Sequence, residues 1–136
     1  MRSRVGLVVL LAVGALAMTA AASVGARRVV GNCTRSQVRP ATIVLFCADF
    51  NVQLTHLDWS SFGASTAFAK GDYYVNSCTP NCAAGTFRAY PIRVALSGAR
   101  PCPDGHDDYR EAAFTFVATK PRGALSKFQL SCPLPG

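Results

Sequence analysis

The residue types that a hydrolytic site needs lie close together in one segment of the chain, at His56, Asp58 and Ser60. Serine hydrolases bring a serine, a histidine and a carboxylate together in space. The surrounding residues do not have the pattern of a nucleophile elbow, and any chain of 136 residues contains such a set. We therefore predict that the protein is not an enzyme and that His56 is a half-buried structural histidine. The alternative is a small extracellular hydrolase that uses His56 with Asp58 or Ser60.

Carboxylates are densest at residues 104–108, where the sequence is DGHDD. Calcium takes oxygen ligands, but the spacing here is not that of an EF-hand loop. We interpret this segment as a solvated turn that Cys102 holds in place. A zinc site at the segment CTPNC, residues 78–82, would need two further ligands, and no histidine lies at the usual spacing. We predict no metal and no cofactor.

Six cysteines predict a domain that is stabilised by disulfide bonds. They are Cys33, Cys47, Cys78, Cys82, Cys102 and Cys132. An even number in an exported domain indicates disulfides, and the sequence cannot choose among the roughly fifteen pairings that six cysteines allow. A bond closing the loop 102–132 would contribute about 3.5–4 kcal/mol, and a local Cys78–Cys82 bond about 2 kcal/mol. A whole domain has a net stability of about 5–15 kcal/mol, so we expect reduction to unfold this one.

The N-terminus has the three parts of a secretory signal peptide. A cationic start is followed by an uncharged apolar run from Val5 to Met18 and by small residues up to Ala26. We predict an N-terminal signal helix within residues 1–26, cleaved after Ala22 or Ala26, and a mature protein that is secreted or held in the cell envelope. The alternative is an uncleaved anchor, which would be the only contact with the membrane.

Positive charge is spread along the sequence and is not gathered into one patch. The chain has 14 Lys and Arg against 7 Asp and Glu, a formal net charge of +7, and loss of Arg2 and Arg4 with the signal leaves about +5. Nucleic-acid binders usually cluster their basic residues. We therefore predict no nucleic-acid partner, although a basic surface is weakly attracted to an anionic cell envelope.

Short apolar segments separated by turn residues predict a single disulfide-linked β domain over residues 41–136, after a polar leader segment at 27–40. The expected strands are 42–48, 52–59, 66–74, 86–97, 109–119 and 125–132. The run at 42–48 is continuously apolar and is interpreted as a buried strand. No part of residues 27–136 has a convincing helical repeat. The pattern favours an all-β fold, a small antiparallel β-sandwich or open barrel.

Two positions predict irregularities within these strands. Pro91 lacks a backbone donor, so the strand at 86–97 is expected to lie at a sheet edge or to carry a bulge. Gly71 and Asp72 predict a bulge or turn within the strand at 66–74.

Aromatic residues beside a polar turn favour recognition of a ligand. We predict a non-catalytic binding module whose contact surface centres on Trp59, Phe62 and the turn that contains Asp49 and Asn51. Burial of Trp59 in the core is the competing interpretation. The expected partner is a cell-wall polymer or another protein. A structural envelope protein without a discrete ligand is a further alternative.

Five motifs follow one another along the chain. They are CAD at 47–49, LDWSSFG at 57–63, CTPNCAAG at 78–85, YP at 90–91 and a late Phe-rich strand that ends at Cys132. This order resembles small secreted actinobacterial proteins of unknown function, over most of the chain after Val38. The resemblance implies secretion and no particular ligand or catalytic residue. Cys33 and Cys102 fit the shared pattern least well, which implies that they pair with each other.

Overall fold

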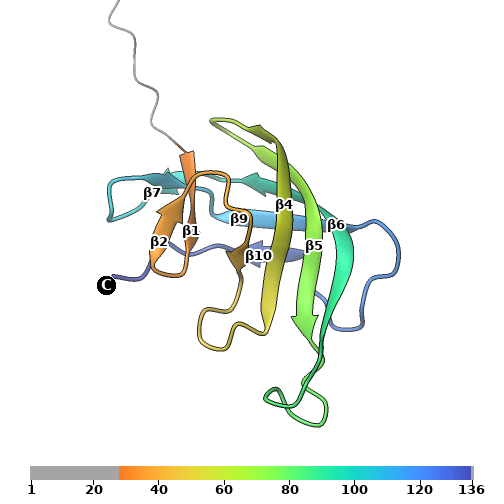
Figure 1. The fold of residues 1–136 in the computed structure, drawn as a ribbon. Helices are drawn as coiled ribbons and strands as arrows, with labels where there is room; N and C mark the ends of the chain where they lie inside the picture. Colours follow the sequence, from red (N-terminus) through yellow and green to blue (C-terminus); the bar gives the residue numbers. More distant parts are fainter. Residues whose placement is uncertain (1–27, 136) are drawn as a thin grey trace, which may run out of the picture.

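A computed structural model describes residues 28–135 as a β domain of ten strands (Figure 1). The predicted signal peptide lies outside the described residues. The strands are β1 (Arg28–Asn32), β2 (Arg35–Gln37), β3 (Ile43–Val44), β4 (Val52–Phe62), β5 (Ala67–Asn76), β6 (Phe87–Ser97), β7 (Arg100–Pro101), β8 (Asp107–Asp108), β9 (Glu111–Phe116) and β10 (Lys127–Gln129). Residues 28–135 contain no helix, and hence none long and apolar enough to cross a membrane.

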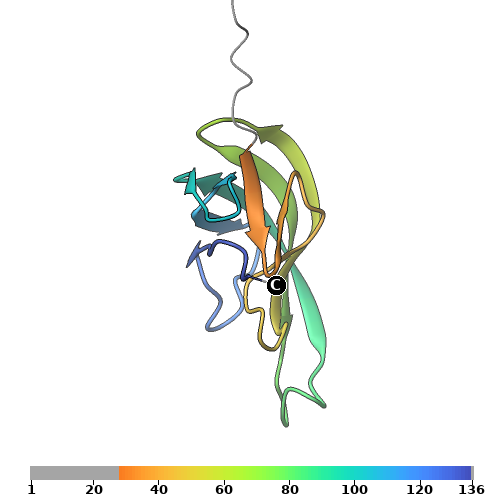
Figure 2. The ribbon, with the colours of Figure 1, turned by 90° about the vertical axis from the view of Figure 1, so that its left-hand side faces the viewer.

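The larger sheet has six antiparallel strands in the order β10-β9-β6-β5-β4-β3. Along its long strands, successive side chains point alternately to the core and to solvent. In β6, Ile92, Val94 and Leu96 are buried between more exposed residues. Such alternation gives the sheet one apolar face and one solvated face. The strands curve, so the sheet curls around the core (Figure 2). The predicted all-β, antiparallel fold is confirmed.

The smaller sheet, in the order β2-β1-β8-β7, is built partly from the segment predicted as a leader. β1 pairs with β2 antiparallel and with β8 in parallel. Val29 and Val30 of β1 are buried, and Val30 belongs to the main core. Arg28 keeps its charge at the surface in an ion pair with Asp107. Residues 28–37 are therefore part of the folded domain. The segment is polar on average, but β1 contains two valines that are buried.

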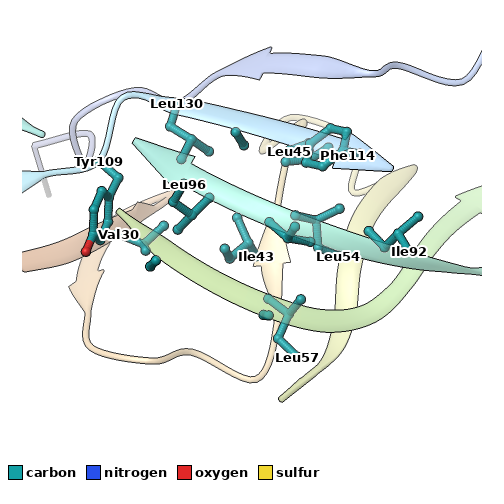
Figure 3. Close-up of a cluster of buried hydrophobic side chains, with 14 of the residues drawn as sticks. Val30, Ile43, Leu45, Leu54, Leu57, Ile92, Leu96, Tyr109, Phe114 and Leu130 are labelled. Carbon is teal, nitrogen blue, oxygen red and sulfur yellow. The ribbon is translucent and has the colours of Figure 1, made fainter. Parts of the chain in front are cut away.

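The core lies inside the curl of the larger sheet and takes side chains from both sheets (Figure 3). Leu54 of β4, Ile92 of β6 and Val30 of β1 are at most 1% exposed. Tyr109 is fully buried, and its hydroxyl donates to the backbone carbonyl of Gly63. Because this polar atom has a partner, its burial does not cost the free energy of an unsatisfied group.

All six cysteines form disulfide bonds, as predicted. The pairs are Cys33–Cys47, Cys78–Cys82 and Cys102–Cys132. The Cys33–Cys102 pair implied by the resemblance is wrong. Cys33 follows β1, which lies against the outer edge of β3, and this position brings Cys33 to Cys47.

Pro91 lies in the middle of the larger sheet, and the prediction of an edge strand is wrong. β6 pairs with β5 on one side and with β9 on the other. The pairing with β9 starts at Ile92, opposite Phe116, and the N–H of Val117 donates to the carbonyl of Pro91 over 3.0 Å. The missing donor of Pro91 therefore falls at the end of the β9 ladder, where it interrupts no further pairing.

The irregularity predicted at Gly71 and Asp72 lies in the neighbouring strand. β5 runs through Gly71 without a break, whereas β4 shifts register between Thr55 and Asp58. His56, inside this bulge, has a φ of 52°. A Cβ on residue 71 would lie 2.7 Å from the carbonyl oxygen of Thr55. The glycine therefore makes room for the backbone of the bulge opposite it.

Candidate functional site

The two edge strands of the larger sheet, β3 and β10, face one another across a gap that we call the seam. Phe46 follows β3 and Phe128 lies in β10, and their rings meet edge to face with centroids 5.4 Å apart. The predicted strand at 42–48 pairs only over Ile43–Val44, and Phe46 is 42% exposed. Side chains, and no backbone ladder between β3 and β10, therefore close this part of the sheet.

The β3 side of the seam is covered by β1. The side-chain amide of Asn32 replaces a neighbouring strand, because its Oδ1 accepts the N–H of Val44 over 3.0 Å and its Nδ2 donates to the carbonyl of Thr42 over 2.9 Å. Nδ2 also donates to Oε1 of Gln37 over 2.6 Å. The outward N–H of Val44 in β3 and the carbonyl of Thr42 just before it are thereby hydrogen-bonded, as buried backbone groups generally are.

The β10 side of the seam is open. The carbonyl of Ser126 and the N–H of Leu130 form hydrogen bonds on the β9 side. Backbone groups alternate in direction along an antiparallel strand, so those of Lys127 and Gln129 point away from β9. Within residues 28–135 these outward groups have no protein partner. β10 therefore presents an unpaired strand edge to the seam.

An apolar groove follows the seam, and we call it the seam groove. Its larger part has a volume of about 300 Å³, with residues 44–49 on one wall and residues 128, 130–132 and 134 on the other. A second part of about 180 Å³ is lined by Val52, Tyr73, Val75 and residues 121–125. Phe46 lines both parts and divides them. Sites for small or extended ligands are typically apolar hollows that start at about 300 Å³.

The two walls of the seam groove differ in charge. Arg122 lines the smaller part of the groove, and Lys127 lies next to Phe128 in β10 without lining either part; both are exposed. No Asp or Glu occurs in residues 112–136. On the β3 wall Asp49 is the charged residue among residues 44–49. The β10 wall therefore favours anionic groups on a ligand.

Trp59 and Phe62, two of the predicted contact residues, are half-buried and packed against the core. Their rings meet edge to face at 5.0 Å, and Phe62 meets Tyr109 in the same way at 5.3 Å. The indole N–H of Trp59 donates to the carbonyl of Pro40 over 2.8 Å. These contacts occupy the rings within the fold, in agreement with the competing interpretation of Trp59 as a core residue.

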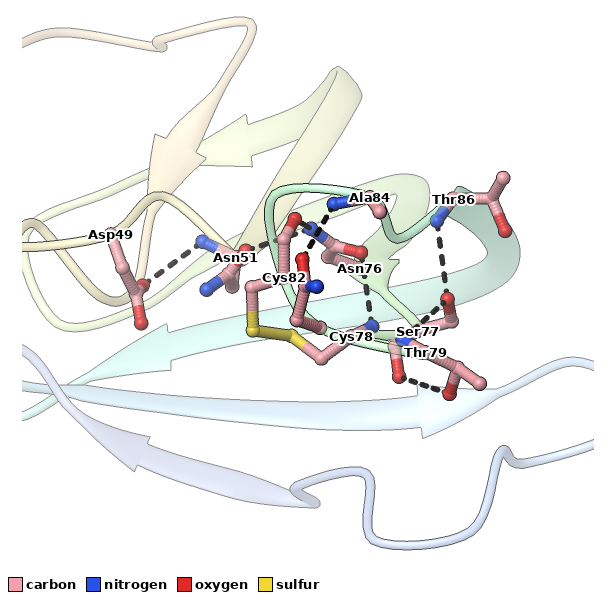
Figure 4. The surroundings of a disulfide bond; sticks show 10 residues. Asp49, Asn51, Asn76, Ser77, Cys78, Thr79, Cys82, Ala84 and Thr86 are labelled. Atoms are coloured by element: carbon pink, nitrogen blue, oxygen red, sulfur yellow. Dashed lines mark hydrogen bonds between the residues drawn. A yellow bond between two sulfur atoms is a disulfide. The ribbon is translucent and has the colours of Figure 1, made fainter.

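Asp49 and Asn51, the other two predicted contact residues, lie at the opposite end of β4. Asp49 accepts the N–H of Asn51 over 3.0 Å, and Oδ1 of Asn51 accepts a hydrogen bond from Nδ2 of Asn76 over 3.0 Å (Figure 4). The 11 residues of β4, at about 3.3 Å each, put roughly 30 Å between this turn and Phe62. The four residues therefore do not form one surface, and only Asp49 lines the seam groove.

The side chain of His56 is 82% exposed, so the prediction of a half-buried histidine is wrong. The bulge in β4 turns this side chain outward. Its Nδ1 lies 3.1 Å from Oδ2 of Asp72, whereas the hydroxyl of Ser60 donates to the carbonyl of Phe68 over 3.2 Å. The trio His56, Asp58 and Ser60 is therefore not joined by hydrogen bonds in the way that a serine hydrolase requires.

The acidic segment at 104–108 is only partly the solvated turn that was predicted. Asp108 is fully buried beside β1, and burial raises the pKa of its carboxyl. Asp104 is exposed, and the hydrogen bond from Ser36 Oγ over 2.6 Å lowers its pKa. The sulfur of Cys102 lies within 4.8 Å of both carboxylates, but its bond to Cys132 leaves no thiolate to hold a metal.

Comparison with known proteins assigns no family to this chain. No protein-family model matches it, and no curated protein and no solved structure is significantly similar to it. The resemblance to small secreted actinobacterial proteins therefore stays a prediction.

One signal in the sequence points to the seam groove. Ile43, Leu45 and Cys47 share one face of the apolar run, so Phe46 falls on the opposite, outward face. No comparable signal marked Phe128, because its position opposite Phe46 depends on the curl of the whole sheet.

Proposed function

We propose that this protein is an exported, non-catalytic binding module that acts in the cell envelope or beyond it and holds an extended apolar ligand in the seam groove. The observation that carries the proposal is the groove itself, an apolar hollow between two sheet edges that are not paired to each other. Three disulfide bonds suit an oxidising compartment outside the cytoplasm.

Two disulfide bonds fix the walls of the groove. Cys33–Cys47 fixes the end of the β3 wall, and Cys102–Cys132 fixes the end of the β10 wall. A site with fixed walls loses little conformational entropy when a ligand binds. The rings of Phe46 and Phe128 are the aromatic side chains that line the larger part.

A groove-filling variant tests the proposal with two kinds of probe. The probes are laurate and peptides selected from a random displayed library on the oxidised protein. Ala48 lines the larger part of the groove, so the indole of Ala48→Trp should fill it and weaken binding by about tenfold or more. Ala64→Trp, at an exposed position between β4 and β5, is the matched control.

We expect at least one kind of probe to bind the wild type and the control and to bind Ala48→Trp more weakly. Binding that is equal in all three proteins would place the ligand site elsewhere. Absence of binding by both kinds of probe would favour a structural envelope protein without a discrete ligand.

A further inference from the structure

We propose that the ligand of the seam groove is an acidic peptide segment of a partner protein, which binds in extended conformation as an additional strand along the open edge of β10. This inference rests on the proposed function, because it names the class of ligand for the same groove.

The main-chain groups of β10 favour a peptide over other extended apolar ligands. Lys127 and Gln129 each turn one N–H and one carbonyl into the seam, two residues apart. A peptide in β conformation offers donors and acceptors at this same two-residue repeat. An acyl chain has no such groups along its length, so it would leave those of β10 without partners. Strand addition to an exposed sheet edge is a general mode of peptide recognition.

The β3 side of the seam restricts the new strand to β10. The amide of Asn32 already bonds the N–H of Val44 and the carbonyl of Thr42. A peptide cannot pair with these groups without displacing Asn32 from β1. The added strand is therefore expected to hydrogen-bond on one side only, with its side chains directed into the groove and toward solvent in alternation.

The shape of the groove suits alternate apolar side chains. Phe46 separates a part of about 300 Å³ from a part of about 180 Å³. Side chains on the same face of a strand are about 6.6–6.8 Å apart. Apolar residues at positions i and i+2 of the peptide are expected to enter the two parts, on either side of the Phe46 ring.

The positive charge near β10 favours an acidic peptide as the ligand over a second copy of this chain. Arg122 lines the smaller part of the groove and Lys127 is exposed in β10, and the carboxylate nearest to β10 along the β9 ladder is that of Glu111, opposite Gln129. Pairing of β10 with β10 of another copy would bring no carboxylate to Lys127, because residues 127–129 contain no Asp or Glu, and would lack the opposite-charge pair that stabilises a sheet. Acidic residues between the apolar positions of a partner peptide would meet Lys127 and Arg122 favourably.

The probe for this inference is the peptide acetyl-Glu-Val-Glu-Phe-Glu-Leu-Glu-amide with a fluorescent label, measured by anisotropy. In two further peptides, three backbone nitrogens are methylated, either those of the apolar residues or those of three glutamates. The two sets of N–H groups point to opposite edges of a strand. We expect one methylated peptide to bind at least about tenfold more weakly and the other to stay within about twofold of the parent. Equal binding by both, or equal loss in both, would overturn strand addition.

A variant of the protein tests the same bond from the other side. Gln129→Pro removes a donor that points into the seam and leaves the β9 ladder intact, which an edge strand tolerates. We expect the parent peptide to bind at least about tenfold more weakly, and any binding of laurate to be unchanged. The methylated peptides test the inference on the wild-type protein should this variant fail to fold.

Charge is tested by a peptide in which lysine replaces every glutamate, and by Lys127→Glu. The lysine peptide should bind the wild type at least about tenfold more weakly, and Lys127→Glu should reduce this difference. Equal binding of both peptides by the wild type would overturn the acidic preference. Laurate binding that Ala48→Trp weakens, without binding of the parent peptide, would overturn this inference and leave the proposed function standing.

Discussion

The two edge strands of the larger sheet differ in whether their outward backbone groups are hydrogen-bonded. At β3, the amide of Asn32 bonds the carbonyl of Thr42 and the N–H of Val44. At β10, the outward groups of Lys127 and Gln129 have no partner within residues 28–135. Natural sheets commonly protect an edge either by covering it or by placing a lysine on it. In this protein the β3 edge is covered, and the β10 edge is protected only by Lys127.

The difference shows that the core can be shielded from water although the two edge strands, β3 and β10, are not hydrogen-bonded to each other. β1 completes the core with Val30 and at the same time covers β3 through Asn32. The contact between Phe46 and Phe128 spans the rest of the seam. Aromatic rings exclude water from the core without using the backbone groups of β10, so this edge stays available to a ligand.

The largest expected effect concerns the disulfides that hold the two edges. Replacing Cys102 and Cys132 with alanine opens a link of 30 residues and should lower the free energy of unfolding by about 3.6 kcal/mol. Replacing Cys33 and Cys47, 14 residues apart, should cost about 3 kcal/mol. Urea denaturation of the oxidised proteins measures both losses.

The matched control for these variants is the Cys78–Cys82 bond, which touches neither edge. Its separation of 4 residues predicts a loss of about 1.9 kcal/mol. A loss at Cys78–Cys82 as large as that at Cys102–Cys132 would contradict the view that the edge disulfides dominate stability.

The next largest effect is expected when the edge of β3 loses its cover. Asn32→Ala removes three hydrogen bonds of a half-buried amide and should destabilise the domain by about 2–3 kcal/mol, since each net bond contributes about 1 kcal/mol. The freed edge should also increase self-association, which sedimentation measures. Asn81→Ala, at an exposed position with one bond to the N–H of Ala84, is the control. Equal losses in the two variants would show that Asn32 does not protect the edge.

A smaller effect concerns the small sheet that supports β1, and it depends on pH. Burial raises the pKa of Asp108 above its ordinary value of 3.8, so the folded state binds this proton more tightly than the unfolded state. Its contribution to stability is fully present below the ordinary pKa and is lost as pH rises through the folded pKa. Asp108→Asn should therefore be more favourable relative to the wild type at about pH 7 than at about pH 4.

Urea denaturation across this range measures the difference between Asp108→Asn and the wild type. The hydrogen bond from Ser36 lowers the pKa of Asp104, and its contribution has the opposite sign, being lost as pH falls through the folded pKa. Asp104 is present in both proteins, and it is coupled to Asp108 by charge and by the shared hydroxyl of Ser36, so the comparison reports Asp108 together with this coupling. A difference in stability that does not change with pH would refute the prediction.

The smallest effect is expected far from both edges, at the bulge in β4. His56 has a φ of 52° and an exposed side chain. Glycine adopts this conformation without steric cost, which offsets its greater entropy in the unfolded chain. His56→Gly should change the free energy of unfolding by less than about 0.5 kcal/mol. A large loss in thermal or urea denaturation would give His56 a structural role that its contacts do not explain.

The fold was more accessible from the sequence than the candidate site was. The alternation at 86–97 located β6 and its core face, because a strand with one buried face must repeat every two residues. The site depends on which residues meet across the seam, and Phe46 and Phe128 are 82 positions apart. The Trp59 prediction failed to define a surface for the same reason: Phe62, Tyr109 and Pro40 meet there only in the folded chain.

Cysteine number and the two-residue repeat are local properties, so they were enough to predict a disulfide-bonded, antiparallel β domain. The pairing of the cysteines, the segment that covers β3 and the edge that stays open became visible in the folded chain. These outcomes depend on how the six-stranded sheet curls, and the curl brings together residues that are distant along the chain. Local periodicity sets the direction of each side chain but carries no information about what it meets across the seam.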